Sequence, residues 1–227
     1  MQSVSLSNRV LSPLRDPPVI LFRTECHDRN SAAYNSTFRN FNIVSRGPHI
    51  LLTREAFDNC LSWKKVNTPL IPFTKSWKRA IRRRQRLLED GNKEIVIIAI
   101  WAKGLQNVYD ASEVAKMLRC SNDGGNRCNH DDEYLIHGGI SADDYRLLAV
   151  FDGQKEQRLG LNLPGLIGST TVPDGFISTA PGTTGNEKLQ NTIYMYTGIR
   201  GESAQLWYLI GFMIGAFDLP CISFVIG

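Results

Sequence analysis

The sequence lacks the short motifs that mark the commonest nucleotide-binding folds. It contains no G-x-G-x-x-G pattern and no phosphate-binding P-loop, and its predicted strands and helices do not alternate regularly. Internal repeats and long low-complexity tracts are also missing from the sequence. These absences exclude a doubly wound sheet and predict an α+β fold, in which any nucleotide would bind by another architecture.

Cysteine is scarce, and the N-terminus has no continuous apolar run. The five cysteines are scattered and odd in number, and a chain of 227 residues with 42% apolar content buries a core without a disulfide framework. We therefore expect reduced thiols in an intracellular compartment, cytoplasmic or nuclear. Without an apolar h-region the N-terminus does not form a secretory signal, and its Ser, Pro and Arg content predicts a flexible arm over residues 1–17.

Acidic residues are absent from residues 75–86, which hold seven of the 26 basic residues, so the remainder of the chain has 19 basic against 22 acidic residues. The apolar residues of this segment follow a helical stripe, which predicts an amphipathic helix capped by Ser76 or Thr74. A solvated cationic face is favoured over a nucleic-acid surface, because no aromatic interleaving or reader motif accompanies the charges. Nucleic-acid binding stays as an alternative. The stripe comprises Trp77, Ala80, Ile81, Leu87 and Leu88.

Other elements follow from local patterns. Thr53 precedes a helical stripe, and Asp110 with Glu113 forms a capping box before another helix. The segment TPLIPF reads as a short strand, which Pro69 and Pro72 should confine to an edge or an irregular position. Apolar, β-branched runs predict further strands. These are VILF (19–22), EIVIIAIW (94–101), EYLIHGGI (133–140) and YRLLAVFD (145–152).

Three of these stretches, taken together, resemble a known family. They are LFR at residues 21–23, TPLIPFTKSW at 68–77 and HDDEYLI at 130–136. Their order resembles the Arg, Ser-Thr-Ser, Glu-x-Glu triad of the enterotoxin-like ADP-ribosyltransferases, and more closely a fungal family of uncharacterised domains that looks like a remote branch of that fold. The resemblance covers residues 18–152 and implies mixed sheets with packed helices.

The resemblance also implies a role for each matching residue. Arg23 and Ser76 would contact NAD, the implied cofactor, and Thr74 would help to orient Glu133. Glu133 would stabilise the positive charge that develops as nicotinamide leaves. Asp131 would activate an acceptor, a protein of unknown identity. Since residues two apart on a strand face the same side, we expect Asp131 and Glu133 to point into one cleft.

Two departures from the triad weaken the catalytic prediction. The family's Ser-Thr-Ser is replaced by Pro72-Phe73-Thr74, which lacks the first hydroxyl, and the acidic pair is Asp-x-Glu, one methylene shorter at its first member. These departures predict an ADP-ribosyltransferase-like domain that binds NAD or a related nucleotide and is catalytically degenerate. The alternatives are a non-enzymatic interaction module on the same fold and, for Arg23 itself, a solvated strand end or a structural ion pair.

Two further segments suggest a metal site and a membrane span, and neither is favoured. Cys120, Cys128, His130 and His137 have the spacing C-x7-C-x-H-x6-H, which matches no usual zinc pattern, so no metal site is expected. Residues 206–227 carry a single charge, Asp218, but Asp218 and Pro220 interrupt the run, and a core helix with a packed terminus is favoured over a membrane anchor. Residues 153–227 should therefore form a Gly/Pro-rich connection and an apolar helical extension.

Overall fold

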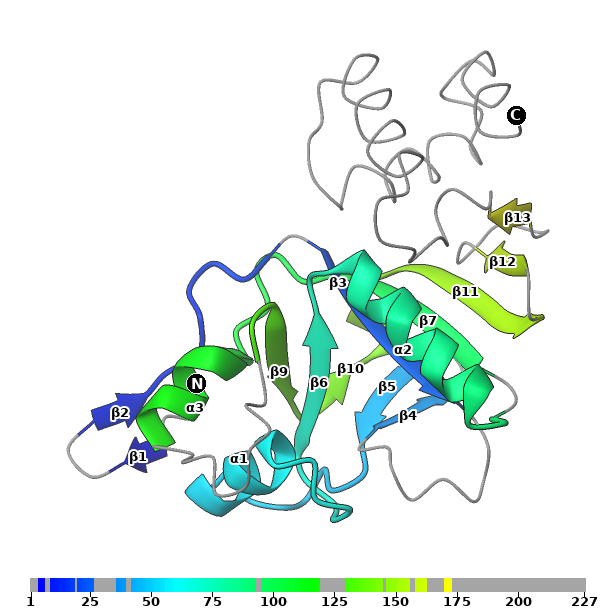
Figure 1. Ribbon diagram of the computed structural model, residues 1–227. Helices are drawn as coiled ribbons and strands as arrows, with labels where there is room; N and C mark the ends of the chain where they lie inside the picture. The colour runs from blue at the N-terminus through cyan, green and yellow to red at the C-terminus, as the bar shows by residue number, and fades with distance from the viewer. Residues whose placement is uncertain are drawn as a thin grey trace. The chain divides into compact units, whose positions relative to one another are not determined.

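The computed structural model describes part of the chain in two compact units. The first unit comprises Met1–Arg23, Arg29–Lys75 and Ile100–Leu147, and the second Thr24–Asp28, Ser76–Ala99 and Leu148–Gly227. These units cut across the boundaries expected at residues 17 and 152. The residues that the structure describes are 4–6, 9–18, 20–26, 36–39, 42–92, 95–118, 130–144, 146–155, 158–162 and 170–172 (Figure 1).

The first unit combines antiparallel strands with two helices. Strands β1 (Val4–Leu6) and β2 (Arg9–Leu11) pair as a hairpin, and β10 (Gly139–Ile140), β5 (Asn42–Ser45) and β4 (Ser36–Arg39) form a three-stranded sheet in that order. A further set of neighbouring strands runs β3 (Ile20–Cys26), β6 (Leu70–Thr74), β9 (Glu133–His137) and β8 (Val108–Asp110). The helices are α1 (Arg54–Leu61) and α3 (Ala111–Leu118), and a 3-10 turn spans Ala142–Asp144.

The second unit holds the basic helix and the later strands. Helix α2 spans Trp77–Glu89. Its strands follow the order β13 (Thr170–Val172), β12 (Arg158–Asn162), β11 (Leu147–Lys155), β7 (Ile95–Trp101) and β3. Strands β3, β7 and β11 each contribute residues to both units. Helices and largely antiparallel strands thus confirm the predicted α+β class.

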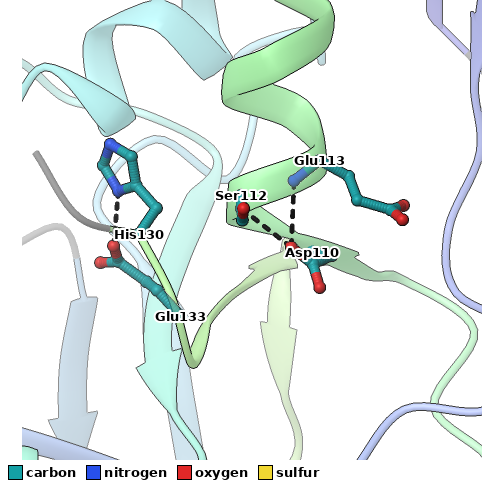
Figure 2. A network of polar contacts seen from close by, with 5 residues as sticks. All are labelled: Asp110, Ser112, Glu113, His130 and Glu133. Carbon is teal, nitrogen blue, oxygen red and sulfur yellow. Dashed lines mark hydrogen bonds and ion pairs between the residues drawn. The ribbon is translucent and has the colours of Figure 1, made fainter.

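The predicted N-cap residues, Thr53 and Asp110, cap α1 and α3, whereas the Glu113 side chain is directed away from Asp110 and does not complete the expected capping box (Figure 2). The Thr53 hydroxyl accepts a hydrogen bond from the Ala56 amide at 3.2 Å, and the Asp110 carboxylate accepts from Ser112 and Glu113 at 2.8 and 3.1 Å (Figure 2). The apolar faces of α1 and α3 share one core with residues of the neighbouring strands. This core comprises Leu11, Leu52, Phe57, Cys60, Leu61, Leu70, Tyr109, Ala111, Val114, Leu118 and Leu135.

Part of the expected flexible arm belongs to this core. Leu11 is only 3% exposed, and the Leu14 amide donates to the Val108 carbonyl at 2.7 Å. The prediction of a flexible arm did not include this packing. It relied on the Ser, Pro and Arg content of the stretch, which does not indicate whether a single leucine is buried.

Strand β6 lies between β3 and β9, so the prediction of an edge or irregular strand was wrong. The Lys75 amide donates to the Asp132 carbonyl at 3.0 Å, and the Gly138 amide donates to the Pro69 carbonyl at 2.8 Å. Since hydrogen-bonded positions alternate along a strand, the odd-numbered residues of β6 bond to β9 and residue 72 faces β3. The missing amide of Pro72 therefore leaves the ladder between β6 and β9 intact.

Helix α2 buries one residue that the charge pattern did not predict. The Ser76 hydroxyl accepts from the Arg79 amide at 3.2 Å, as expected for an N-cap, and Trp77, Ala80, Ile81 and Leu87 are buried as the stripe predicts. Arg84 is also buried, only 1% exposed. It lies three residues after Ile81 and three before Leu87, so its position belongs to the apolar stripe although its charge suggested solvent.

The C-terminal predictions fall mostly outside the described residues, including the helical extension and the run 206–227. Within the described part, β12 and β13 pair antiparallel where a Gly/Pro-rich connection was expected. No helix of the described residues is both long and apolar enough to cross a membrane.

Candidate functional site

Thr74 and Glu133 lie opposite each other at adjoining ends of two strands. They are paired in the register of β6 and β9, and Thr74 is paired on its other side with Phe22 of β3. Directly opposed residues of antiparallel strands present their side chains on one face, and a pair without mutual backbone bonds brings its Cα atoms to about 4.5 Å. Both residues are buried. The sheet thus brings together two residues that are far apart in the sequence.

Arg23 follows Phe22 directly and reaches the same part of β6. Its guanidinium Nη1 donates a hydrogen bond to the Pro72 carbonyl at 2.6 Å, and Arg23 is only 6% exposed. The interpretation of Arg23 as a solvated strand end is therefore wrong. The Arg23 guanidinium is buried at the sheet and bonds to the backbone of β6. The bond lies on the side that faces β3, where Pro72 has no amide to donate.

A turn before β9 joins Glu133 to a histidine. The Glu133 amide donates to the His130 carbonyl at 3.1 Å, and the His130 Nδ1 lies 2.7 Å from the Glu133 Oε2 (Figure 2). Both side chains are buried. The spacing of histidines and cysteines had raised His130 only as a candidate zinc ligand, so this pair was not predicted. The three-residue spacing between histidine and glutamate was its only signal, and that spacing is informative only once a turn is known.

Asp131 lies in that turn and not on the strand. It is exposed, whereas β9 begins at Glu133. The intervening Asp132 has a left-handed backbone, with φ of 63°, which breaks the two-residue alternation on which the prediction relied. The prediction that Asp131 and Glu133 share one face of a strand was therefore wrong.

Lys75, directly after β6, bonds to the turn that precedes β9. Its Nζ lies 2.9 Å from Asp132 Oδ1, in addition to the backbone bond between the same two residues. The hydrogen bond to Asp132 raises the pKa of the Lys75 ammonium. Burial raises the pKa of the neighbouring Tyr134 phenol, and the Lys75 charge opposes that rise. Two strands and the turn between their ends thus form one hydrogen-bonded frame around Glu133.

The remaining predicted residues have other surroundings. Ser76, expected to contact a cofactor, caps α2 and is assigned to the second unit. His137 lies at the far end of β9, where burial lowers its pKa. Among the described residues no group of three or more His, Cys, Asp or Glu side chains could hold a metal ion, and Cys120 and Cys128 lie outside them.

Comparisons with known proteins give a family and a distant likeness. The family described as "Domain of unknown function (DUF7587)" matches residues 16–144, a span that includes Arg23, Thr74 and Glu133. This match confirms the expected resemblance to an uncharacterised domain family. No curated protein matches the chain. Among solved structures, a chain named EcPltA has a TM-score of 0.42 and 11% identity, over 73% of this chain and 90% of that chain.

Proposed function

Because the chain belongs to the DUF7587 family, whose function is unknown, we propose its function from the residues themselves. It is an ADP-ribosyltransferase-like domain that binds NAD or a related nucleotide and has little or no transfer activity. The carrying observation is the pairing of Thr74 with Glu133 on neighbouring strands, which puts a hydroxyl and a carboxylate on one face of the sheet. Arg23 lies on the next strand, directly after Phe22, which pairs with Thr74. Because successive residues of a strand face opposite sides, the Arg23 side chain starts from the other face, and its guanidinium bonds at the Pro72 carbonyl between the two strands.

The proposed chemistry is cleavage of the bond between nicotinamide and ribose. As that bond breaks, its electron pair moves to the ring nitrogen, so nicotinamide leaves neutral and positive charge develops on the ribose. The Glu133 carboxylate stabilises this cation, as a carboxylate does in glycoside hydrolysis. An oxygen of water then bonds to the ribose carbon and releases a proton, giving ADP-ribose.

Water is the expected acceptor because the features for positioning a protein acceptor are weak. Pro72 shares the face of Thr74 and Glu133, since it lies two residues from Thr74, but it offers no hydroxyl there. Asp131 is exposed in the turn, away from the strand position from which it would activate an acceptor. A small acceptor in solution needs less positioning than a protein side chain does. Slow NAD hydrolysis is therefore the residual activity that we expect.

The decisive measurement is nicotinamide release from NAD by the full chain. Glu133→Gln keeps the shape of the side chain but removes its charge, so it should abolish turnover while NAD binding persists. Glu113→Gln is the matched control, because Glu113 is an exposed glutamate at the start of α3, and this variant should equal the wild type.

Two results would contradict the proposal. Robust transfer to protein by the wild type would show that the missing hydroxyl is dispensable. Absence of both binding and turnover at millimolar NAD would leave a non-enzymatic interaction module on the same fold, with Arg23 serving the sheet alone.

A further inference from the structure

The contact between His130 and Glu133 places an imidazole next to a carboxylate in a dry environment. The two side chains are 7% and 6% exposed, and the Nδ1 to Oε2 distance is 2.7 Å. A carboxylate oxygen accepts hydrogen bonds, and a ring nitrogen of histidine can donate one. The contact therefore gives one Glu133 oxygen a partner on the His130 ring inside the protein.

The backbone fixes the ring relative to the carboxylate. The Glu133 amide bonds to the His130 carbonyl, which closes a four-residue turn, and Asp132 takes the left-handed conformation within it. Lys75 binds this turn through its amide and its ammonium. Because a backbone bond and a side-chain bond both join His130 to Glu133, the orientation of the Glu133 carboxylate is set before any ligand arrives.

We propose that His130 is the positioning residue that orients Glu133 toward the nicotinamide ribose. This inference rests on the proposed function. It assigns to His130 the role that a hydroxyl at residue 72 would fill in the enterotoxin-like pattern, where this chain has proline. An imidazole suits that role, because its ring N–H can donate a hydrogen bond to a carboxylate oxygen, as a hydroxyl does.

The test compares three variants of the full chain by the kinetics of nicotinamide release. His130→Ala removes the donor and should lower kcat and kcat/KM together, by up to about 100-fold, because a misplaced catalytic group costs about that much. His130→Asn should recover most of the loss, since its amide nitrogen is attached at the position of Nδ1. His137→Ala is the control, a second partly buried histidine on β9 whose backbone amide bonds to Asn107, and it should match the wild type.

The outcomes separate this inference from the proposed function. Turnover in the wild type with an unchanged His130→Ala variant would overturn the positioning role and leave the proposed function standing. If neither turnover nor NAD binding is found in the wild type, the proposed function falls and the inference falls with it. If His130→Ala does not fold, His130→Gln replaces it, because its amide lies one bond farther out. Equal activity of His130→Asn and His130→Gln would then overturn the inference.

Discussion

The guanidinium of Arg23 donates a hydrogen bond to the carbonyl of Pro72 at 2.6 Å. Proline cannot donate from its own amide, and the alternation of bonds along β6 turns that amide position toward β3. Arg23 follows Phe22, the residue of β3 that pairs with Thr74. The arginine side chain therefore bonds across the two strands beside the position where an amide is missing, a structural role that exists with or without a ligand.

Removing this bond should destabilise the protein. A buried hydrogen bond to a charged group contributes about 1.5–3 kcal/mol, so we expect Arg23→Ala to lower the free energy of unfolding by about that amount. Arg54→Ala is the matched control, because the exposed Arg54 also donates from its guanidinium to a carbonyl, that of Leu118, at 3.2 Å. Urea denaturation measures both variants. If both variants lost the same small amount of unfolding free energy, the bond from Arg23 would not be important for the stability of the sheet.

The contact between Lys75 and Asp132 should make the turn sensitive to alkaline pH. The folded-state pKa of Lys75 is raised above its ordinary value of 10.5, so the pair stabilises the fold below that pH and loses its contribution as pH rises through the folded value. The side chains are 50% and 42% exposed, so the contribution at neutral pH should be small, about 0–1 kcal/mol. Comparing urea denaturation of the wild type and Asp132→Asn from neutral to alkaline pH measures this difference.

Asp132→Asn preserves the left-handed backbone, which asparagine tolerates. Asp132→Ala also removes the charge but strains the position at φ of 63°, at a further cost of about 1–2 kcal/mol. If the two variants were equally stable, backbone conformation would not be what shapes this turn.

Helix α2 offers its own test of the nucleic-acid alternative. Lys78, Arg82 and Arg86 are exposed on it, whereas Arg84 is buried. We expect a solvated face, and hence no retarded mobility of a labelled duplex or single strand at low salt. If binding were nevertheless seen, replacing the three exposed residues with Gln should flatten the dependence of log K on log salt by about 3 for a duplex. Such a result would reverse our interpretation of this helix.

The helices and strand β7 could be predicted because their signals are local. A capping residue, a stripe at helical spacing and a β-branched run each lie within a few residues, and Thr53, Ser76 and Asp110 all cap the helices that they were expected to cap. The interior place of β6 could not be predicted in this way. Whether a proline is tolerated there depends on which neighbour its amide would face, and that is set by pairing across the sheet.

The motif spacing indicated which strands should lie together, but it did not indicate the geometry at their ends. The spacing of the motifs pointed to Arg23, Thr74 and Glu133, and their strands are indeed neighbours. It did not reveal that β9 starts at Glu133, because a single left-handed residue, Asp132, decides where the strand begins. The same turn brings His130 to Glu133, so one unpredicted backbone conformation accounts for both the misplaced Asp131 and the missed histidine.

Placing a hydroxyl at residue 72 tests directly why nicotinamide release at this site should be slow. Pro72→Ser adds a hydroxyl on the face that carries Thr74 and Glu133, together with an amide directed toward β3. We expect this variant to release nicotinamide faster than the wild type, because Glu133 gains a second orienting donor.

Pro72→Ala is the control, because it removes the ring and restores the amide without adding a hydroxyl. The serine variant should exceed it in kcat, and equal rates would mean that the backbone change alone matters. The sharper comparison places Pro72→Ser in the His130→Ala background. If His130 fills the place of the lost hydroxyl, the serine should recover activity there by a larger factor than it adds to the wild type, because the two donors serve one carboxylate and their effects are not independent. Equal factors in the two backgrounds would mean that histidine and hydroxyl act separately.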